Sequence, residues 1–124
     1  MSEVETEKKI EKIPDNINSI LQQYVKQIVE AYNTHVRKII LFGSYARGDY
    51  KKDSDIDIMV LVDFPREDIG KMRKEMSDIS YNFAYDNDIE INPLMQNADF
   101  FGRWIRAYPF YNNVINEGVE LYAA

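Results

Sequence analysis

Hydrophobic and polar residues alternate along the chain in patterns that predict helices and strands. Apolar residues recur every three or four positions over residues 17–33 and again over residues 66–85, a spacing typical of helices that pack one face against a core. Residues 36–42 and 55–62 form short apolar runs rich in branched side chains, which predict buried strands. The predicted order is therefore helix, strand, strand, helix.

The last third of the chain continues this alternation. Residues 88–95 alternate between polar and apolar, which predicts a third strand, and Pro93 restricts that strand to a sheet edge or to its own end. The elements expected after it are a helix capped by Asn97, a helix over residues 110–117 and a short tail at 119–121. Strands that alternate with helices predict an α/β (α+β) fold, with a small mixed sheet flanked by helices.

Length and composition predict one globular domain over residues 1–124, of which residues 1–13 form a charged, mobile leader. The leader lacks the apolar stretch of a signal peptide, and no apolar run is long enough to span a bilayer, so we expect a cytoplasmic protein without a membrane partner. With no cysteine, disulfides and thiolate zinc sites are excluded. A net charge of −6 argues against extensive nucleic-acid binding.

Gly43 and Ser44 stand between the strand predicted at 36–42 and a helical turn predicted at 45–47. Backbone N–H groups at the start of such a turn attract anions, and glycine permits a close approach, so a phosphate would fit there. Taken alone this signal is weak, because Gly-Ser is also an ordinary joint between a strand and a turn.

Asp55 and Asp57 add a second, independent signal. Residues two apart on a strand project to the same face, about 6–7 Å apart at their Cα atoms. Two carboxylates beside a core are costly without a cation or hydrogen bonds, so we expect one or two divalent ions there, with a solvated strand end as the alternative. A third carboxylate would complete a two-metal site; we expect Glu90 in that role, with Asp88 on the same face as the alternative.

Two other phosphate or metal motifs do not match. A calcium loop starting at Asp53 would need Gly and Glu where the chain has Ile58 and Phe64. A P-loop would need Gly-Lys-Ser/Thr after the glycine, which this chain lacks.

The segments 43–48 (Gly-Ser-Tyr-Ala-Arg-Gly) and 54–58 (Ser-Asp-Ile-Asp-Ile) together resemble the signature of the minimal nucleotidyltransferases, an antitoxin-type family of the DNA polymerase β-like superfamily. Eleven positions separate Ser44 from Asp55, in agreement with that family. The resemblance extends over residues 17–121 and implies a fold like the polymerase β palm. One departure is that the third acid, usually Asp in that family, is Glu90 here.

The resemblance implies transfer of a nucleoside monophosphate, AMP from ATP, to an acceptor hydroxyl with release of pyrophosphate. Two Mg²⁺ ions would be held by Asp55, Asp57 and Glu90, and Glu90 would either bind the second ion or accept the acceptor's proton. Gly43 and Ser44 would hold the β- and γ-phosphates. For Arg47 two roles stay open, a phosphate contact or an ion pair with a motif acid.

Small members of this family are often encoded beside a HEPN-domain toxin and can adenylylate it, so the resemblance implies such a partner protein as acceptor. The alternative is a non-catalytic antitoxin that neutralises its partner by binding it. Aromatic residues would supply that surface, although we expect most of them in the core: Phe100, Phe101, Trp104, Tyr108, Phe110 and Tyr111. An aminoglycoside or RNA acceptor fits a short acidic chain less well, and the sequence leaves homo-oligomer formation open.

Overall fold

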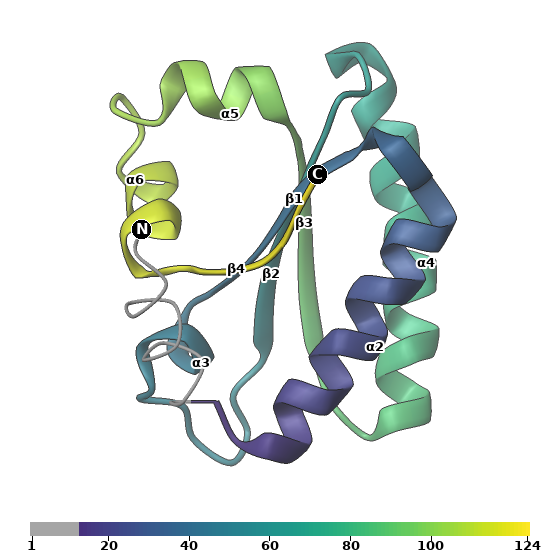
Figure 1. Cartoon of the computed structure of the whole chain (residues 1–124), viewed down its shortest axis with the longest axis vertical. Coiled ribbons are helices and arrows are strands. Elements are labelled where there is room, and N and C mark those ends of the chain that lie inside the picture. Colours follow the sequence, from purple (N-terminus) through teal and green to yellow (C-terminus); the bar gives the residue numbers. More distant parts are fainter. Residues whose placement is uncertain (1–12) are drawn as a thin grey trace.

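The computed structural model describes residues 13–124, which form a four-stranded sheet between two layers of helices (Figure 1). In chain order the elements are α2 (Asp15–Tyr32), the 3₁₀ turn η1 (Asn33–His35), β1 (Val36–Phe42), α3 (Ser44–Arg47), β2 (Ile56–Val62), α4 (Arg66–Asn87), β3 (Ile91–Asn97), α5 (Ala98–Trp104), α6 (Pro109–Glu117) and β4 (Val119–Ala123). This arrangement confirms the predicted α/β class with a small mixed sheet and flanking helices.

The strand order in the sheet is β3-β2-β1-β4. β1 runs antiparallel to both β2 and β4, whereas β2 and β3 are parallel, with Ile56 opposite Ile91 and Asp57 opposite Asn92. β3 therefore lies at an edge, where Pro93 is tolerated because its missing N–H need not face a further strand. The edge position predicted from Pro93 is confirmed.

β2 is buried on both faces, which explains its nearly unbroken run of apolar residues. Ile58 and Val60 face the larger core beneath α2 and α4, where Tyr24 and Ile28 pack. Met59 and Leu61 alternate to the opposite face and pack in a smaller core, which contains Phe101 of α5 and Val114 of α6. By the same alternation Asp57 lies on the α5/α6 face, at the N-terminal end of β2.

Two of the predicted strand boundaries are wrong. The third strand starts at Ile91 and not at residue 88, because α4 continues to Asn87 and Asp88 then takes the left-handed C-cap conformation, with φ 53° and ψ 47°. The segment 119–121, expected as a tail, belongs to β4, whose pairing with β1 makes it the second edge of the sheet.

The predicted leader mostly lies outside the described residues. Its one described residue, Ile13, is 4% exposed and belongs to the larger core rather than to a leader. Among residues 13–124, no helix has the length and hydropathy needed to cross a membrane.

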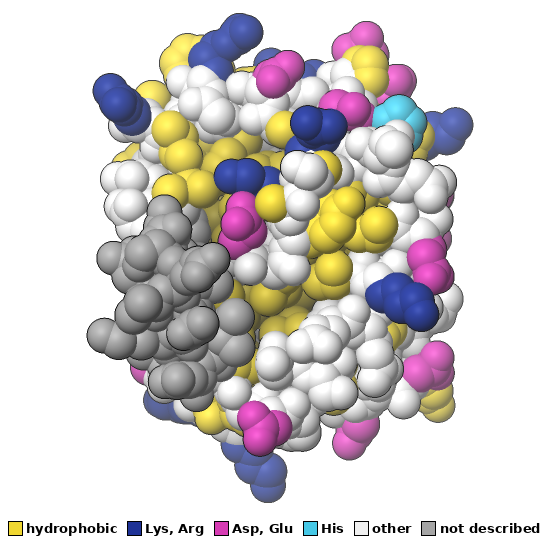
Figure 2. Space-filling model, in the orientation of Figure 1, with side chains coloured by type: hydrophobic (Ala, Val, Ile, Leu, Met, Phe, Trp, Pro, Cys, Tyr) yellow, Lys and Arg dark blue, Asp and Glu magenta, His cyan; other side chains and the backbone are white. Residues whose placement is uncertain are grey.

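The aromatic residues of α5 and α6 are less buried than predicted. Phe101 is in the core at 2% exposure, but Trp104, Tyr108 and Phe110 are 41–44% exposed. Hydrophobic side chains gather over this region, at the upper left of Figure 2. The expectation that most of this aromatic group is core therefore fails for these three side chains.

Candidate active site

Gly43 joins β1 to α3 in a conformation that requires glycine. Its φ of 74° and ψ of −155° lie in a region that other residues essentially avoid. A Cβ at this position would collide with the carboxylate of Asp57, whose Cγ would be only 3.1 Å away. The glycine thus brings the start of α3 close to Asp57, although Gly43 and Asp57 are 14 positions apart in the sequence.

The first turn of α3 begins with two backbone N–H groups that precede its hydrogen bonds. Ala46 and Arg47 donate to the Gly43 carbonyl at 3.1 and 3.0 Å, so the N–H groups of Ser44 and Tyr45 precede the first hydrogen bonds of the turn. Gly48 closes the turn with φ 90°. The predicted helical turn after Gly43 is confirmed, and it presents backbone donors beside the Asp57 carboxylate.

Asp57 is held in place by the neighbouring strand. The parallel register puts Asn92 directly opposite, and its Nδ2 donates to Asp57 Oδ1 at 3.0 Å. The other oxygen, Oδ2, is the atom that faces Gly43. Asn92 was not among the predicted site residues, although it lies two positions after Glu90 and therefore on the same face of an extended strand.

Asp55 and Glu90 are the residues just before β2 and β3, where Ile56 N donates to Glu90 O at 2.8 Å. The Glu90 carboxyl is hydrogen-bonded to that of Asp55, and this bond together with repulsion between the two raises the pKa of Glu90 above its ordinary value. Two carboxylates in contact favour either a shared proton or a bound cation. Glu90 and Asp55 are therefore brought together as the spacing suggested.

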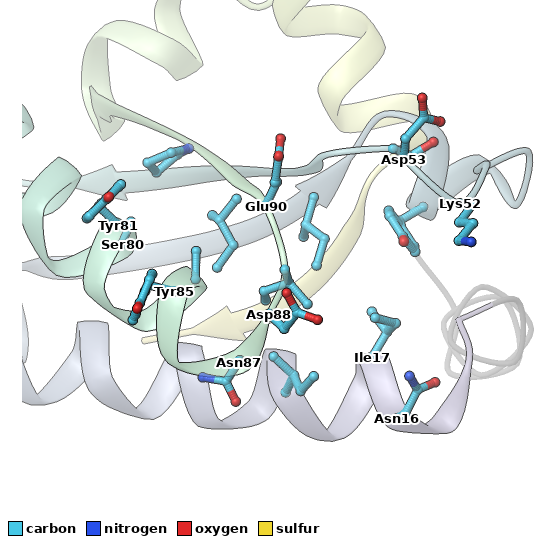
Figure 3. Close-up of a pocket in the computed structure, with 18 of the residues that line it drawn as sticks. Asn16, Ile17, Lys52, Asp53, Ser80, Tyr81, Tyr85, Asn87, Asp88 and Glu90 are labelled. Carbon is cyan, nitrogen blue, oxygen red and sulfur yellow. The ribbon is translucent and has the colours of Figure 1, made fainter.

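Asp88 differs from Glu90 in direction. Figure 3 shows Glu90 pointing away from α2, whereas Asp88 lies on the α2 side of the chain. The expectation that both share one face fails because Asp88 is the left-handed C-cap of α4, so the alternation of a strand begins only after it. Within residues 13–124, no three His, Cys, Asp or Glu side chains converge as a ready-made metal cluster.

A pocket of about 380 Å³ opens beside Gly43 and Asp57. Its walls come from the end of β1, from α3, from β2 and from one side of α6: Phe42, Gly43, Ser44, Arg47, Asp57, Phe110, Asn113, Val114 and Glu117. The contribution of α6 was not predicted, because nothing in the sequence pattern shows that residues some 60 positions after Asp57 fold back over it.

Arg47 spans this pocket from α3 towards α6. Its Nε lies 3.3 Å from Asp49 and its Nη1 lies 3.4 Å from Glu117, and the hydrogen bond with Asp49 is the main cause that raises its pKa. Of the two roles left open for Arg47, pairing with an acid is observed, but neither acid belongs to the Asp55/Asp57 motif. Both ion pairs are partly exposed, so a competing phosphate could replace them at low cost.

Backbone donors, an arginine and carboxylates in one pocket suit a phosphate together with a divalent cation. Comparison with known proteins agrees with this chemistry. A family model described as a nucleotidyltransferase domain matches residues 22–94, which is more than half of the chain and includes every element of the site except α6. The chain belongs to the nucleotidyltransferase domain family.

Relatives share this family across most of the chain. A Methanocaldococcus jannaschii protein provisionally named a protein adenylyltransferase is 32% identical over 86% of this chain and 99% of its own length. The protein adenylyltransferase MntA of Thermococcus cleftensis is 47% identical over 48% of this chain and 54% of its own length. The predicted family and its transferase class are thereby confirmed.

Solved structures support the same fold. A crystal structure titled as a toxin-antitoxin with AMP-PNP matches with a TM-score of 0.55 and 20% identity, over 83% of this chain and 73% of that chain. A mutant of the MntA-HpeT toxin-antitoxin matches with a TM-score of 0.55 and 18% identity over the same shares of the two chains. At these identities the similarity shows the fold of this nucleotidyltransferase and not its substrates.

Proposed function

We propose that this nucleotidyltransferase is a Mg²⁺-dependent protein adenylyltransferase, a single domain that transfers AMP from ATP to a hydroxyl group of a partner protein. The observation that carries the proposal is the contact of Gly43 with Asp57 in a pocket that also contains Ser44 and Arg47. The names of the relatives support the adenylyl group and the protein acceptor. A cytoplasmic location stays a prediction.

The oxygen donors of the site fit the chemistry of a magnesium ion, although among residues 13–124 no three carboxylates converge on one point. Asp57 Oδ2 faces the joint at Gly43, and Asp55 and Glu90 form a pair whose mutual repulsion a cation would offset. Asp55, Asp57 and Glu90 would hold the metal, which supplies charge neutralisation and orientation of the triphosphate when bound. Asn92 keeps the Asp57 carboxylate oriented by its hydrogen bond to Oδ1.

The remaining roles follow from position in the pocket. Ser44 and the first N–H groups of α3 would hold the β- and γ-phosphates, and Arg47 would leave Glu117 to pair with phosphate. The acceptor oxygen forms a bond to the α-phosphorus while the bond to pyrophosphate breaks. The proton of the hydroxyl group passes to Glu90 or to solvent, so that the products are the adenylylated protein, pyrophosphate and a proton.

The decisive experiment incubates the purified chain with α-³²P-ATP, Mg²⁺ and the protein encoded by the neighbouring gene. We expect label on that protein, loss of label in EDTA, and a fall of at least a hundredfold in Asp57→Asn, since a misplaced or missing reacting group costs about that much. Asp78→Asn is the matched control, because Asp78 is an exposed carboxylate on α4 away from the pocket. Equal labelling by wild type and Asp57→Asn would refute the proposal.

The proposed partner is a HEPN-type toxin. A second candidate function is that the chain neutralises this toxin by binding it, without transferring AMP. The exposed side chains of Trp104, Tyr108 and Phe110 favour a binding surface of this kind, since exposed aromatic residues are enriched at interfaces. Neutralisation of the toxin that is unaffected by Asp57→Asn, with no label transferred, would establish this binding function in place of catalysis.

A further inference from the structure

A second and larger cavity, of about 1250 Å³, lies beside the carboxylates on the side of α2 and α4 (Figure 3). It includes Glu90, the residue that contacts Asp55, whereas Asp57 lines the smaller pocket. The two cavities thus lie on different faces of the sheet, since Asp57 is on the α5/α6 face. The larger one is called the α4 groove below, and it runs between the start of α2, the end of α4 and the start of β3.

The α4 groove has an apolar base and exposed, polar sides. Ile17 and Ile56 are buried in its base, and Ser80 is also buried, with its hydroxyl 2.7 Å from that of Tyr24. Tyr81 and Tyr85, one helical turn apart on α4, are 71% and 79% exposed, which is the highest exposure among the large hydrophobic side chains of residues 13–124. Exposed tyrosines beside an apolar base are typical of protein-binding surfaces.

The size and charge of the groove restrict its occupant. Its volume exceeds the range of about 300–1,000 Å³ of ordinary small-molecule pockets. Among residues 13–124, its charged lining consists of three carboxylates, Asp53, Asp88 and Glu90, and one cation, Lys52. Such a lining repels nucleic-acid phosphates and complements lysine and arginine.

We propose that the α4 groove binds a basic, extended segment of the acceptor protein and so docks that protein next to the site, at the start of β3. This inference rests on the proposed function, because it assigns the docking of that reaction's acceptor protein to a second cavity. ATP occupies the pocket lined by Ser44 and Arg47, and the acceptor segment occupies the groove lined by Tyr81, Tyr85 and Asp88.

The test measures binding directly, by fluorescence anisotropy of two labelled peptides with the full chain. One peptide has a central tyrosine flanked by lysines and the other has the same tyrosine flanked by glutamates. We expect the basic peptide to bind, more weakly at high salt, and the acidic peptide not to bind. Saturating ATP with Mg²⁺ should leave the affinity within about twofold, because the two ligands occupy different cavities.

Two variants test the groove itself. Tyr85→Ala should raise the Kd of the basic peptide about tenfold, as loss of an aromatic anchor does, with Ile115→Ala, an exposed hydrophobic residue outside both cavities, as control. Asp88→Asn should raise that Kd several-fold at low salt. Asn tolerates the left-handed conformation of Asp88, and Asp86→Asn, an exposed carboxylate outside the groove, should have no effect.

Equal binding of the two peptides, equal effects of Asp86→Asn and Asp88→Asn, or displacement of the peptide by ATP would overturn the inference. Failure of the proposed function has a different signature. If the peptide binds as expected but no AMP is transferred to the partner protein, the groove is confirmed as a binding site and the adenylyltransferase proposal fails.

Discussion

Replacing Gly43 by alanine should damage both stability and nucleotide binding, because two separate costs meet at this residue. The conformation at φ 74° and ψ −155° costs a residue with a Cβ about 1–3 kcal/mol. The new methyl group also displaces the Asp57 carboxylate, and the hydrogen bond that Asn92 donates to it is worth about 0.5–1.5 kcal/mol. We therefore expect Gly43→Ala to lower the free energy of unfolding by about 2–4 kcal/mol.

Urea denaturation and thermal melting measure this loss. For a chain of this size, 1 kcal/mol corresponds to about 4 °C, so the Tm should fall by roughly 8–16 °C. Isothermal titration with ATP and Mg²⁺, below the lowered Tm, should show weaker binding as well, since Asp57 no longer lies in its native position. The variant thus links the fold and the site through one backbone conformation.

Gly102→Ala is the matched control. Gly102 lies within α5, has no unusual φ, and a Cβ there would meet nothing within 4 Å. Because alanine favours the helix over glycine, this variant should be neutral or more stable by up to about 1 kcal/mol. If Gly43→Ala melts within about 2 °C of wild type and binds ATP normally, the reasoning from backbone conformation and from the Asp57 contact is refuted.

Three further predictions concern other parts of the structure. Arg47→Ala should raise the Kd of ATP at least tenfold, as expected for loss of a charged hydrogen bond, but should change the free energy of unfolding by less than about 1 kcal/mol, because its ion pairs are exposed. Titration calorimetry measures the Kd and urea unfolding measures the stability, and a stability loss as large as that of Gly43→Ala would contradict the prediction. Burial raises the pKa of Tyr24 to about 12, whereas the pKa in the unfolded chain is near 10. Between these two pH values the unfolded chain binds fewer protons than the folded chain, so the free energy of unfolding, undiminished below pH 10, falls by up to about 1.4 kcal/mol per pH unit as the pH rises to 12. The double variant Tyr24→Phe/Ser80→Ala should flatten this decline in urea unfolding across pH, and an unchanged slope would count against the prediction. Phe101→Ala should lower the free energy of unfolding by about 3–5 kcal/mol, and Trp104→Ala by less than half as much, because the first side chain is 2% exposed and the second 41%. Equal losses in urea unfolding would contradict this prediction.

Several features of the fold and site could be predicted because they depend on neighbouring residues. The apolar spacing of α2 and α4 and the cap at Asn97, whose Oδ1 accepts from Phe100 N at 2.9 Å, follow from helical periodicity and local hydrogen bonding. The edge position of β3 follows from the missing N–H of Pro93. The joint of Gly43 with a helical turn is also local, since glycine alone adopts that backbone conformation easily.

Other features depended on strand pairing, which local patterns do not determine. Asn92 joined the site because the parallel register of β2 and β3 puts it opposite Asp57, and one residue of slip would have moved it to the other face. β4 looked like a tail because its five residues acquire their strand conformation by pairing with β1. Asp88 does not share a face with Glu90, because α4 extends to Asn87, further than its apolar spacing indicated, and Asp88 is its C-cap.

The sequence by itself determined which residues are candidates for the chemistry, namely the Gly43-Ser44 joint and the acids Asp55, Asp57 and Glu90, because their residue types and spacing are properties of the chain. Only the tertiary structure decided what surrounds them: α6 as the wall of one pocket, and the tyrosines of α4 beside the other. These residues lie far from the motif in sequence, so their positions depend on how the helices pack on the two faces of the sheet.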